Sequence, residues 1–202
     1  MAQPARADAF NAVNFLGSMS PTVVLTGQDL GGLVLTPGVY FFASSAQLTG
    51  TLTLDALNDA NARFVFQIGS TLTTASASMV NIVNGTSGTG VFFDVGSSAT
   101  LGSNSVFAGN ILADQSITLD TTARILCGRA LALNGAVTMD ANAISNNCAG
   151  DGDLDSGRTD FGSGGFAGAD SISEVPEPGT VLLIGLGIAA IARARKTKPQ
   201  RS

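Results

Sequence analysis

Histidine and tryptophan are absent from the 202 residues of this chain, and only 12% of its residues are charged. The first lysine is Lys196. Acid–base catalysis needs converging titratable groups, and metal-dependent catalysis needs clustered ligands, of which histidine is the commonest. The chain also has no phosphate-binding loop, no nucleophile elbow and no zinc-ligand spacing. We therefore expect no enzymatic activity, no metal and no cofactor.

The few charges are unevenly distributed along the chain. Residues 1–150 hold four arginines and eight aspartates, residues 151–177 hold seven acidic residues and one arginine, and residues 178–202 hold five basic residues and no acidic ones. This distribution divides the chain into three regions. Because serine, threonine, asparagine and glycine supply most of the polarity, the surface does not suggest nucleic-acid binding.

Short strands with a recurring phrase dominate the body of the chain. A threonine followed by leucine or methionine occurs in "TLTLD", "STLTT", "SATLG", "SITLD" and "AVTMD", and the last two lie 20 residues apart. Apolar runs and Gly/Ser/Asn/Asp corners separate these segments, so each unit is expected to contain three short strands. Such units at a period of 18–20 residues predict a β-solenoid. A β-sandwich is the alternative, since it also has many short strands and turns.

Side chains alternate inward and outward along a strand. The leucine or methionine after each threonine is therefore expected in the interior, and the threonines are expected to form one outward row: Thr53, Thr71, Thr100, Thr118 and Thr138. β-Propensity and threonine pairing across strands would explain such a row without any function. The alternative is a flat array of hydroxyl and methyl groups suited to an ordered surface. An aspartate follows three of these threonines by two residues, and the three are expected in one register: Asp55, Asp120 and Asp140. These carboxylates would either interrupt such a face or cap turns.

One helix and one insertion complete the predicted body. Phe10, Val13 and Leu16 are spaced by three, which predicts a short amphipathic helix that ends near Gly17. The segment 84–90, "NGTSGTG", lies in the longest interval between repeats and is predicted to be a surface loop.

Four long segments resemble microbial ice-binding proteins of the irregular β-solenoid type. They are "LGGLVLTPGVYFF", "LTGTLTLDALNDANARFVFQIGSTLTTASASMVNIVNG", "VFFDVGSSATLGSNSVFAGNILADQSITL" and "CGRALALNGAVTMDANAI", within a resemblance from about Asp8 to Cys148. The resemblance implies a mainly β, three-faced solenoid with one α-helix packed alongside. It also implies adsorption to ice through a flat face, with "TASA" and "LGSN" as incomplete matches to a loose family motif.

Family members begin with additional strands before the helix, so the resemblance implies that this chain lacks its N-terminal part. The segment "MAQPARADAF" has no apolar signal-peptide core, which agrees with that expectation.

The C-terminal segment resembles the PEP-CTERM sorting signal. Pro176-Glu177-Pro178 precedes an apolar run over 181–192 and then a basic cluster. About 20 apolar residues are needed to span a bilayer, so this run is short and would depend on tilt and on basic residues that reach the interface. The resemblance implies export, transient membrane anchoring through a C-terminal hydrophobic helix, cleavage by an exosortase, and release to the cell surface or an exopolysaccharide matrix.

The two cysteines, Cys127 and Cys148, are either buried thiols or a disulfide. Export favours the disulfide, which would fasten the last coil and contribute about 3 kcal/mol in the chain-entropy model. Asp151, Asp153 and Asp155 have the spacing of a calcium loop but lack its glycine and glutamate, so a solvated acidic spacer is expected instead.

The expected organisation is a helix remnant (1–19), a β-solenoid (20–149), an acidic Gly/Ser linker (150–174) and a sorting signal (175–202). The expected function is ice binding outside the cell. The alternative is a matrix or cell-surface structural protein that has the same fold without ice activity.

Overall fold

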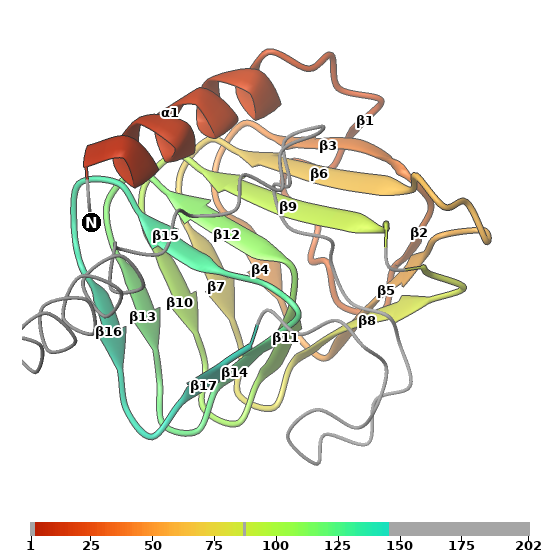
Figure 1. Cartoon of the computed structure of the whole chain (residues 1–202). Coiled ribbons are helices and arrows are strands. Elements are labelled where there is room, and N and C mark those ends of the chain that lie inside the picture. Colours follow the sequence, from red (N-terminus) through yellow and green to blue (C-terminus); the bar gives the residue numbers. More distant parts are fainter. Residues whose placement is uncertain (1–2, 87, 146–202) are drawn as a thin grey trace, which may run out of the picture. The chain divides into compact units, whose positions relative to one another are not determined.

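A computed structural model describes residues 3–86 and 88–145. The described chain begins with one helix, α1 (Gln3–Gly17), and continues through short strands that coil around a common interior (Figure 1). Leu16 is buried and Val13 partly buried, so the predicted amphipathic helix and its end at Gly17 are confirmed. The three-faced β-solenoid is also confirmed, because the strands form three sheets.

Each sheet contains one strand from each successive coil, except that the first coil adds only a single bridge, Asp29 to Gln47, to sheet B. Sheet A consists of β1 (Val23–Val24), β3 (Gly38–Phe42), β6 (Arg63–Ile68), β9 (Gly90–Val95), β12 (Asn110–Ala113) and β15 (Ala130–Ala132). Sheet B consists of β4 (Ala46–Leu48), β7 (Leu72–Thr74), β10 (Ala99–Leu101), β13 (Ile117–Leu119) and β16 (Val137–Met139). Sheet C consists of β2 (Val34–Leu35), β5 (Thr51–Asp55), β8 (Met79–Val83), β11 (Val106–Ala108), β14 (Arg124–Leu126) and β17 (Ala143–Ile144).

All neighbouring strands within the sheets are parallel, and each pairs with the strand one coil away. The chain passes through sheets A, B and C in turn and then returns to A. The corner from sheet C to sheet A therefore lies opposite sheet B (Figure 1). From β2 onward, the longest connections fall at this corner, between β5 and β6 and between β8 and β9. The second contains the predicted surface loop, although its last residue, Gly90, already begins β9.

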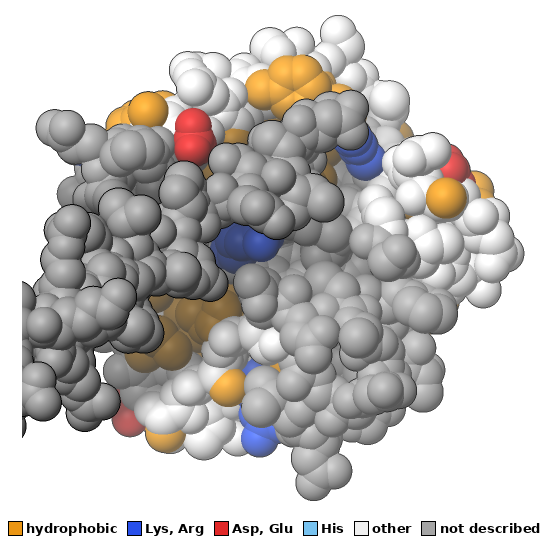
Figure 2. Space-filling view, viewed as in Figure 1, with side chains coloured by type: hydrophobic (Ala, Val, Ile, Leu, Met, Phe, Trp, Pro, Cys, Tyr) orange, Lys and Arg blue, Asp and Glu red, His pale blue; other side chains and the backbone are white. Residues whose placement is uncertain are grey.

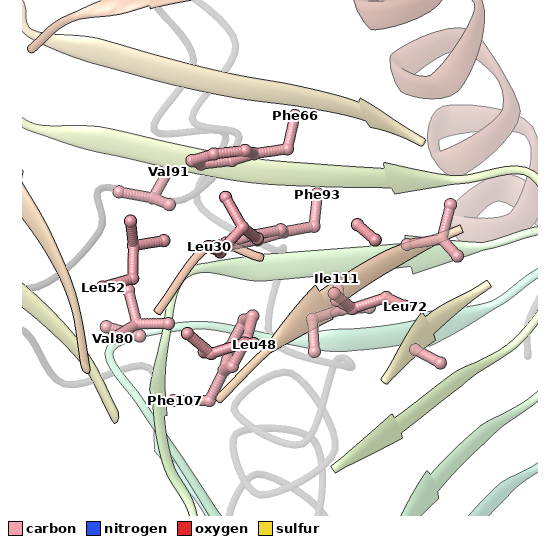
Figure 3. Packing of buried hydrophobic residues seen from close by; sticks show 14 of the residues in the cluster. Leu30, Leu48, Leu52, Phe66, Leu72, Val80, Val91, Phe93, Phe107 and Ile111 are labelled. Atoms are coloured by element: carbon pink, nitrogen blue, oxygen red, sulfur yellow. The ribbon is translucent and has the colours of Figure 1, made fainter. Parts of the chain in front are cut away.

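The interior is filled by inward-facing apolar side chains from all three sheets. An aromatic column runs along sheet A: the ring centroids of Tyr40 and Phe66 lie 5.2 Å apart and those of Phe66 and Phe93 lie 4.5 Å apart. Phe107 of sheet C reaches across the interior to within 4.7 Å of Phe93 (Figure 3). Stacked coils of this kind hold one continuous core, in which each layer covers the next.

The interior column on sheet B differs from the predicted one in two coils. In the first, Leu48 takes the place of Leu54, which belongs to sheet C; the second is the coil of β7. Leu72 lies opposite Ala99, whereas Thr74 lies opposite Leu101 and takes the inward position that a leucine was expected to fill. Thr74 is nevertheless buried, and its Oγ1 accepts a hydrogen bond of 3.0 Å from the backbone N–H of Gly102. A buried hydroxyl is tolerated where it is hydrogen-bonded.

Residues 146–202 lie outside the described part of the chain, and with them lie the predicted linker, calcium-like spacing and sorting signal. No helix within the described ranges is long and apolar enough to cross a membrane.

The last described coil leaves two inward-facing side chains, Val137 and Met139, 37% and 48% exposed.

We expect Phe66→Ala to lower the free energy of unfolding by about 3–5 kcal/mol, because it opens a cavity within the aromatic column. Chemical denaturation measures the change. Phe15→Ala is the matched control, since Phe15 is 56% exposed on α1 and its removal should change stability by less than about 0.5 kcal/mol. Equal losses in the two variants would contradict the assignment of the core.

Candidate functional site: the outer face of sheet B

The outer face of sheet B carries a row of threonines in consecutive coils. Thr100 lies opposite Thr73 on one side and Thr118 on the other, and Thr118 lies opposite Thr138. Gln47 of β4 occupies the same position in the first coil of this sheet. All five side chains are exposed or partly buried, while their neighbours on either side along β7, β10 and β13 are buried.

Two of the five predicted threonines are not in this row. Thr53 belongs to β5 of sheet C, where it lies opposite Val34 and Asn81. The expected alignment was wrong because the corner between sheets B and C is shorter in that coil, and the recurring phrase falls on a different sheet.

Thr71 lies just before β7, and Thr73 takes its predicted place. In "STLTT" the inward Leu72 aligns with Ala99, so the row runs through the second threonine of the segment. The sequence could have identified Thr73, because it directly follows Leu72, which was expected to face inward. The Oγ1 of Thr71 donates a hydrogen bond of 2.8 Å to Oγ of Ser45 in the neighbouring coil.

Small residues, most of them polar, border the threonine row. The residues immediately before the strands are Ser45, Thr71, Ser98, Ser116 and Ala136. Backbone hydrogen bonds keep these residues aligned: the N–H of Leu72 donates to the carbonyl of Ser98, and the N–H of Ala99 donates to that of Ser116. The hydroxyls join the same ladder, since Ser98 Oγ accepts from the Ser116 N–H at 3.3 Å. The result is a regular outward grid of neutral groups.

The predicted aspartate row is also split between two sheets. Asp120 and Asp140 follow β13 and β16 and are adjacent, but Asp55 ends β5 and pairs with Val83. Asp55 accepts hydrogen bonds from Asn84 Nδ2 at 2.8 Å and from the Leu57 N–H at 3.0 Å, and these bonds hold the pKa of its carboxyl below the ordinary value. Within residues 3–86 and 88–145, no three His, Cys, Asp or Glu residues form a group that could hold a metal ion.

Sheet A offers no comparable face, because α1 covers it (Figure 1). Leu16 of α1 packs against a cluster of outward-facing residues of the sheet: Val39, Val65, Phe92 and Leu112. Gln67 Nε2 donates to the carbonyl oxygens of Leu16 and Met19, at 2.7 and 2.8 Å, and so satisfies the end of the helix. At the other end, Arg6 Nη2 donates to Asn134 Oδ1 at 3.1 Å.

The outer face of sheet C is more heterogeneous than that of sheet B. One of its outward rows runs through Thr51, Met79, Val106 and Arg124, and thus mixes a hydroxyl, a thioether, a branched apolar side chain and a charge. Charged side chains are few and scattered on the described surface in view in Figure 2. Of the three sheets, sheet B is therefore the one whose outward row is exposed, uncharged and repeats regularly from coil to coil.

Comparison with known proteins now identifies the family. Residues 1–145 match the family model described as ice-binding-like. The chain belongs to the ice-binding-like family. Residues 174–196 match the PEP-CTERM protein-sorting motif, so both resemblances expected from the sequence are confirmed.

Relatives of this ice-binding-like chain come from bacteria and fungi. An ice-binding protein of Nostoc sp. (strain HG1) is 63% identical over 148 residues, which cover 73% of this chain and 55% of that protein. An ice-binding protein of Flavobacterium frigoris (strain PS1) is 31% identical over 65% of this chain and 47% of its own length. The chain thus spans about half the length of these two curated relatives.

Solved structures agree with the fold. An ice-binding protein from the Antarctic ascomycete Antarctomyces psychrotrophicus is 37% identical, with a TM-score of 0.66 over 71% of this chain and 70% of that one. An ice-binding protein from an Antarctic biological consortium is 42% identical, with a TM-score of 0.66 over 71% of this chain and 65% of that one.

The cysteine pairing stays a prediction. Cys127 is buried directly after β14, but Cys148 lies outside the described residues. Thiol titration of the denatured, unreduced protein tests the pairing, and two free thiols would contradict it.

Asp94 of β9 lies in the outward row of sheet A between Gln67 and Leu112, beneath the C-terminal end of α1. A Cβ placed on Gly17 would lie 3.5 Å from its Oδ2. Burial raises the pKa of Asp94 to about 6. The folded state therefore favours the protonated carboxyl, and stability is lost as the pH rises through this pKa.

We expect Asp94→Asn to match the parent protein in stability near pH 3.5 and to exceed it by about 1 kcal/mol at pH 7.5, a value reduced for the partial solvent exposure of the carboxyl. Urea denaturation at both pH values measures the difference. Asp8→Asn, on the exposed side of α1, controls for the loss of one carboxylate. A gain that is the same at both pH values would contradict the prediction.

Proposed function

We propose that this chain binds ice through the outer face of sheet B, with Thr73, Thr100 and Thr118 at its centre. The observation that carries the proposal is the register of the threonines in consecutive coils, on a sheet that α1 does not cover. Membership of the ice-binding-like family supports it, as do relatives that are named ice-binding proteins.

The geometry suits adsorption to a crystal. Strands of a sheet lie about 4.8 Å apart, and outward residues two positions apart along a strand lie about 6.6 Å apart, so the hydroxyl and methyl groups form a grid of fixed spacing. Threonine side chains are stiff at χ1 because they branch at Cβ. Little side-chain entropy is therefore lost when the grid meets an ordered layer of water. Ice that grows between adsorbed molecules has to curve, which opposes further growth and recrystallisation.

Bulky substitutions test the face. We expect Thr100→Tyr and Thr118→Tyr to abolish recrystallisation inhibition at micromolar protein, because a tyrosine ring would hold the grid away from the ice surface. Thr53→Tyr is the matched control, since Thr53 has a similar outward position on sheet C. The mean crystal size in an annealed frozen film is the measurement, with thermal unfolding to confirm that each variant is folded.

The outcomes separate the two candidate functions. Loss in Thr53→Tyr alone would move the site to sheet C. Crystals that coarsen with the parent protein as they do in buffer would refute ice binding and favour the matrix or cell-surface structural role.

We infer that residues 174–196 direct export, with anchoring through 181–192 and exosortase cleavage near Pro176-Glu177-Pro178. The match to the PEP-CTERM motif supports this inference. Release outside the cell, or into an exopolysaccharide matrix, would place the solenoid where extracellular ice forms.

Cleavage is tested by expressing the full chain, behind a functional export signal, in a bacterium that has an exosortase. We expect the released protein to lack the basic residues from Arg193 onward. Replacing Pro176, Glu177 and Pro178 by alanine should leave the protein full-length and associated with the membrane. Intact mass and cell fractionation measure both results. A released protein that retains its basic end would contradict the cleavage.

A further inference from the structure

One outward row of sheet B changes character along the solenoid axis. The residues that directly follow the strands of this sheet are Thr49, Ala75, Gly102, Asp120 and Asp140. The alignment is maintained by the backbone, since the Ala75 N–H donates to the carbonyl of Leu48 and the Asp120 N–H donates to that of Leu101. This row, which we call the border row, is neutral in its first three coils and carries two carboxylates in its last two.

The neutral part of the border row is flat. Ala75 is exposed and has no atoms beyond Cβ. Gly102 has no side chain, and a Cβ at that position would lie 2.7 Å from the carbonyl oxygen of Thr74. An ice layer that contacts Thr73 and Thr100 therefore meets no projecting side chain at Ala75 or Gly102.

The two carboxylates stand beside the last two threonines of the grid. Asp120 and Asp140 are both exposed, and each lies two residues after its threonine, Thr118 and Thr138. Asp140 Oδ2 accepts a hydrogen bond of 2.5 Å from Thr121 Oγ1. Among the residues that the structure describes, no cation pairs with either carboxylate.

A pair of exposed carboxylates opposes contact with ice at this end of the face. An ionised carboxylate loses much free energy when its hydration shell is removed without a compensating partner. The first water layer around it is oriented by the charge and not by the lattice. The two charges also lie in neighbouring strands, about 4.8 Å apart along the axis, so they act on the same patch of water.

We propose that Asp120 and Asp140 weaken the ice contact over the coils of β13 and β16, and that neutralising them strengthens the contact there. This inference rests on the proposed ice binding of sheet B. It assigns the two aspartates a role in setting the strength of the contact, distinct from the threonines that make the contact.

The test replaces both carboxylates by isosteric amides, Asp120→Asn with Asp140→Asn. The amide oxygen can still accept from Thr121 Oγ1, so the corner keeps its hydrogen bond. We expect the lowest concentration that inhibits recrystallisation to fall by about twofold or more, which corresponds to about 0.4 kcal/mol of adsorption free energy. Asp8→Asn removes a carboxylate from α1, on the side of sheet A, and should leave that concentration unchanged.

A reciprocal variant places the charge inside the neutral part of the row. We expect Ala75→Asp to raise the inhibitory concentration at least several-fold relative to Ala75→Asn, which has the same size but no charge. If the parent protein is active but both comparisons show no difference, the border inference is overturned and the proposed function stands. If the parent protein itself fails to inhibit recrystallisation, the proposed function and the inference built on it both fall.

Discussion

The parallel main-chain hydrogen bonds between successive coils are the constraint on which the rest of the molecule depends. They hold equivalent residues of neighbouring coils opposite one another at a spacing of about 4.8 Å. Inside, this register stacks Tyr40, Phe66 and Phe93 into a column. Outside, the same register aligns Thr100 with Thr118. One set of backbone bonds therefore builds both the core and the candidate binding face.

The helix decides which faces remain available. By packing on sheet A, α1 buries Val65 and Phe92, which would otherwise form an apolar outer surface. Gln67 fastens one end of the helix and Asn134 the other. Sheet B, whose outward side chains are polar, needs no such cover. The contrast between the two faces follows from what alternates with the core residues: valine and phenylalanine on one sheet, threonine and serine on the other.

The low charge of the chain has a functional meaning in this arrangement. A surface meant to meet ordered water is expected to avoid carboxylates. The row from Gln47 to Thr138 does so, with Asp29 beyond Gln47 at one end and Asp120 and Asp140 beside the row at the other. Asp55, by contrast, serves the fold, because it holds the long corner opposite sheet B through Leu57 and Asn84. Asp55 thus stabilises a corner away from the candidate face, whereas Asp120 and Asp140 lie beside that face.

The sequence by itself determined the solenoid, the helix near Gly17 and the family, because hydrophobic alternation, corner residues and recurring segments are local signals. It also located Thr100, Thr118 and Thr138, whose coils have nearly equal lengths. Only the tertiary structure decided that Thr53 belongs to sheet C and that Thr73 replaces Thr71. Because the corners differ in length, the recurring Thr-Leu segment falls on a different sheet in one coil and two residues earlier in another. Which strand pairs with which, and in what register, is settled by hydrogen bonds between segments about 20 residues apart, and no local pattern encodes them.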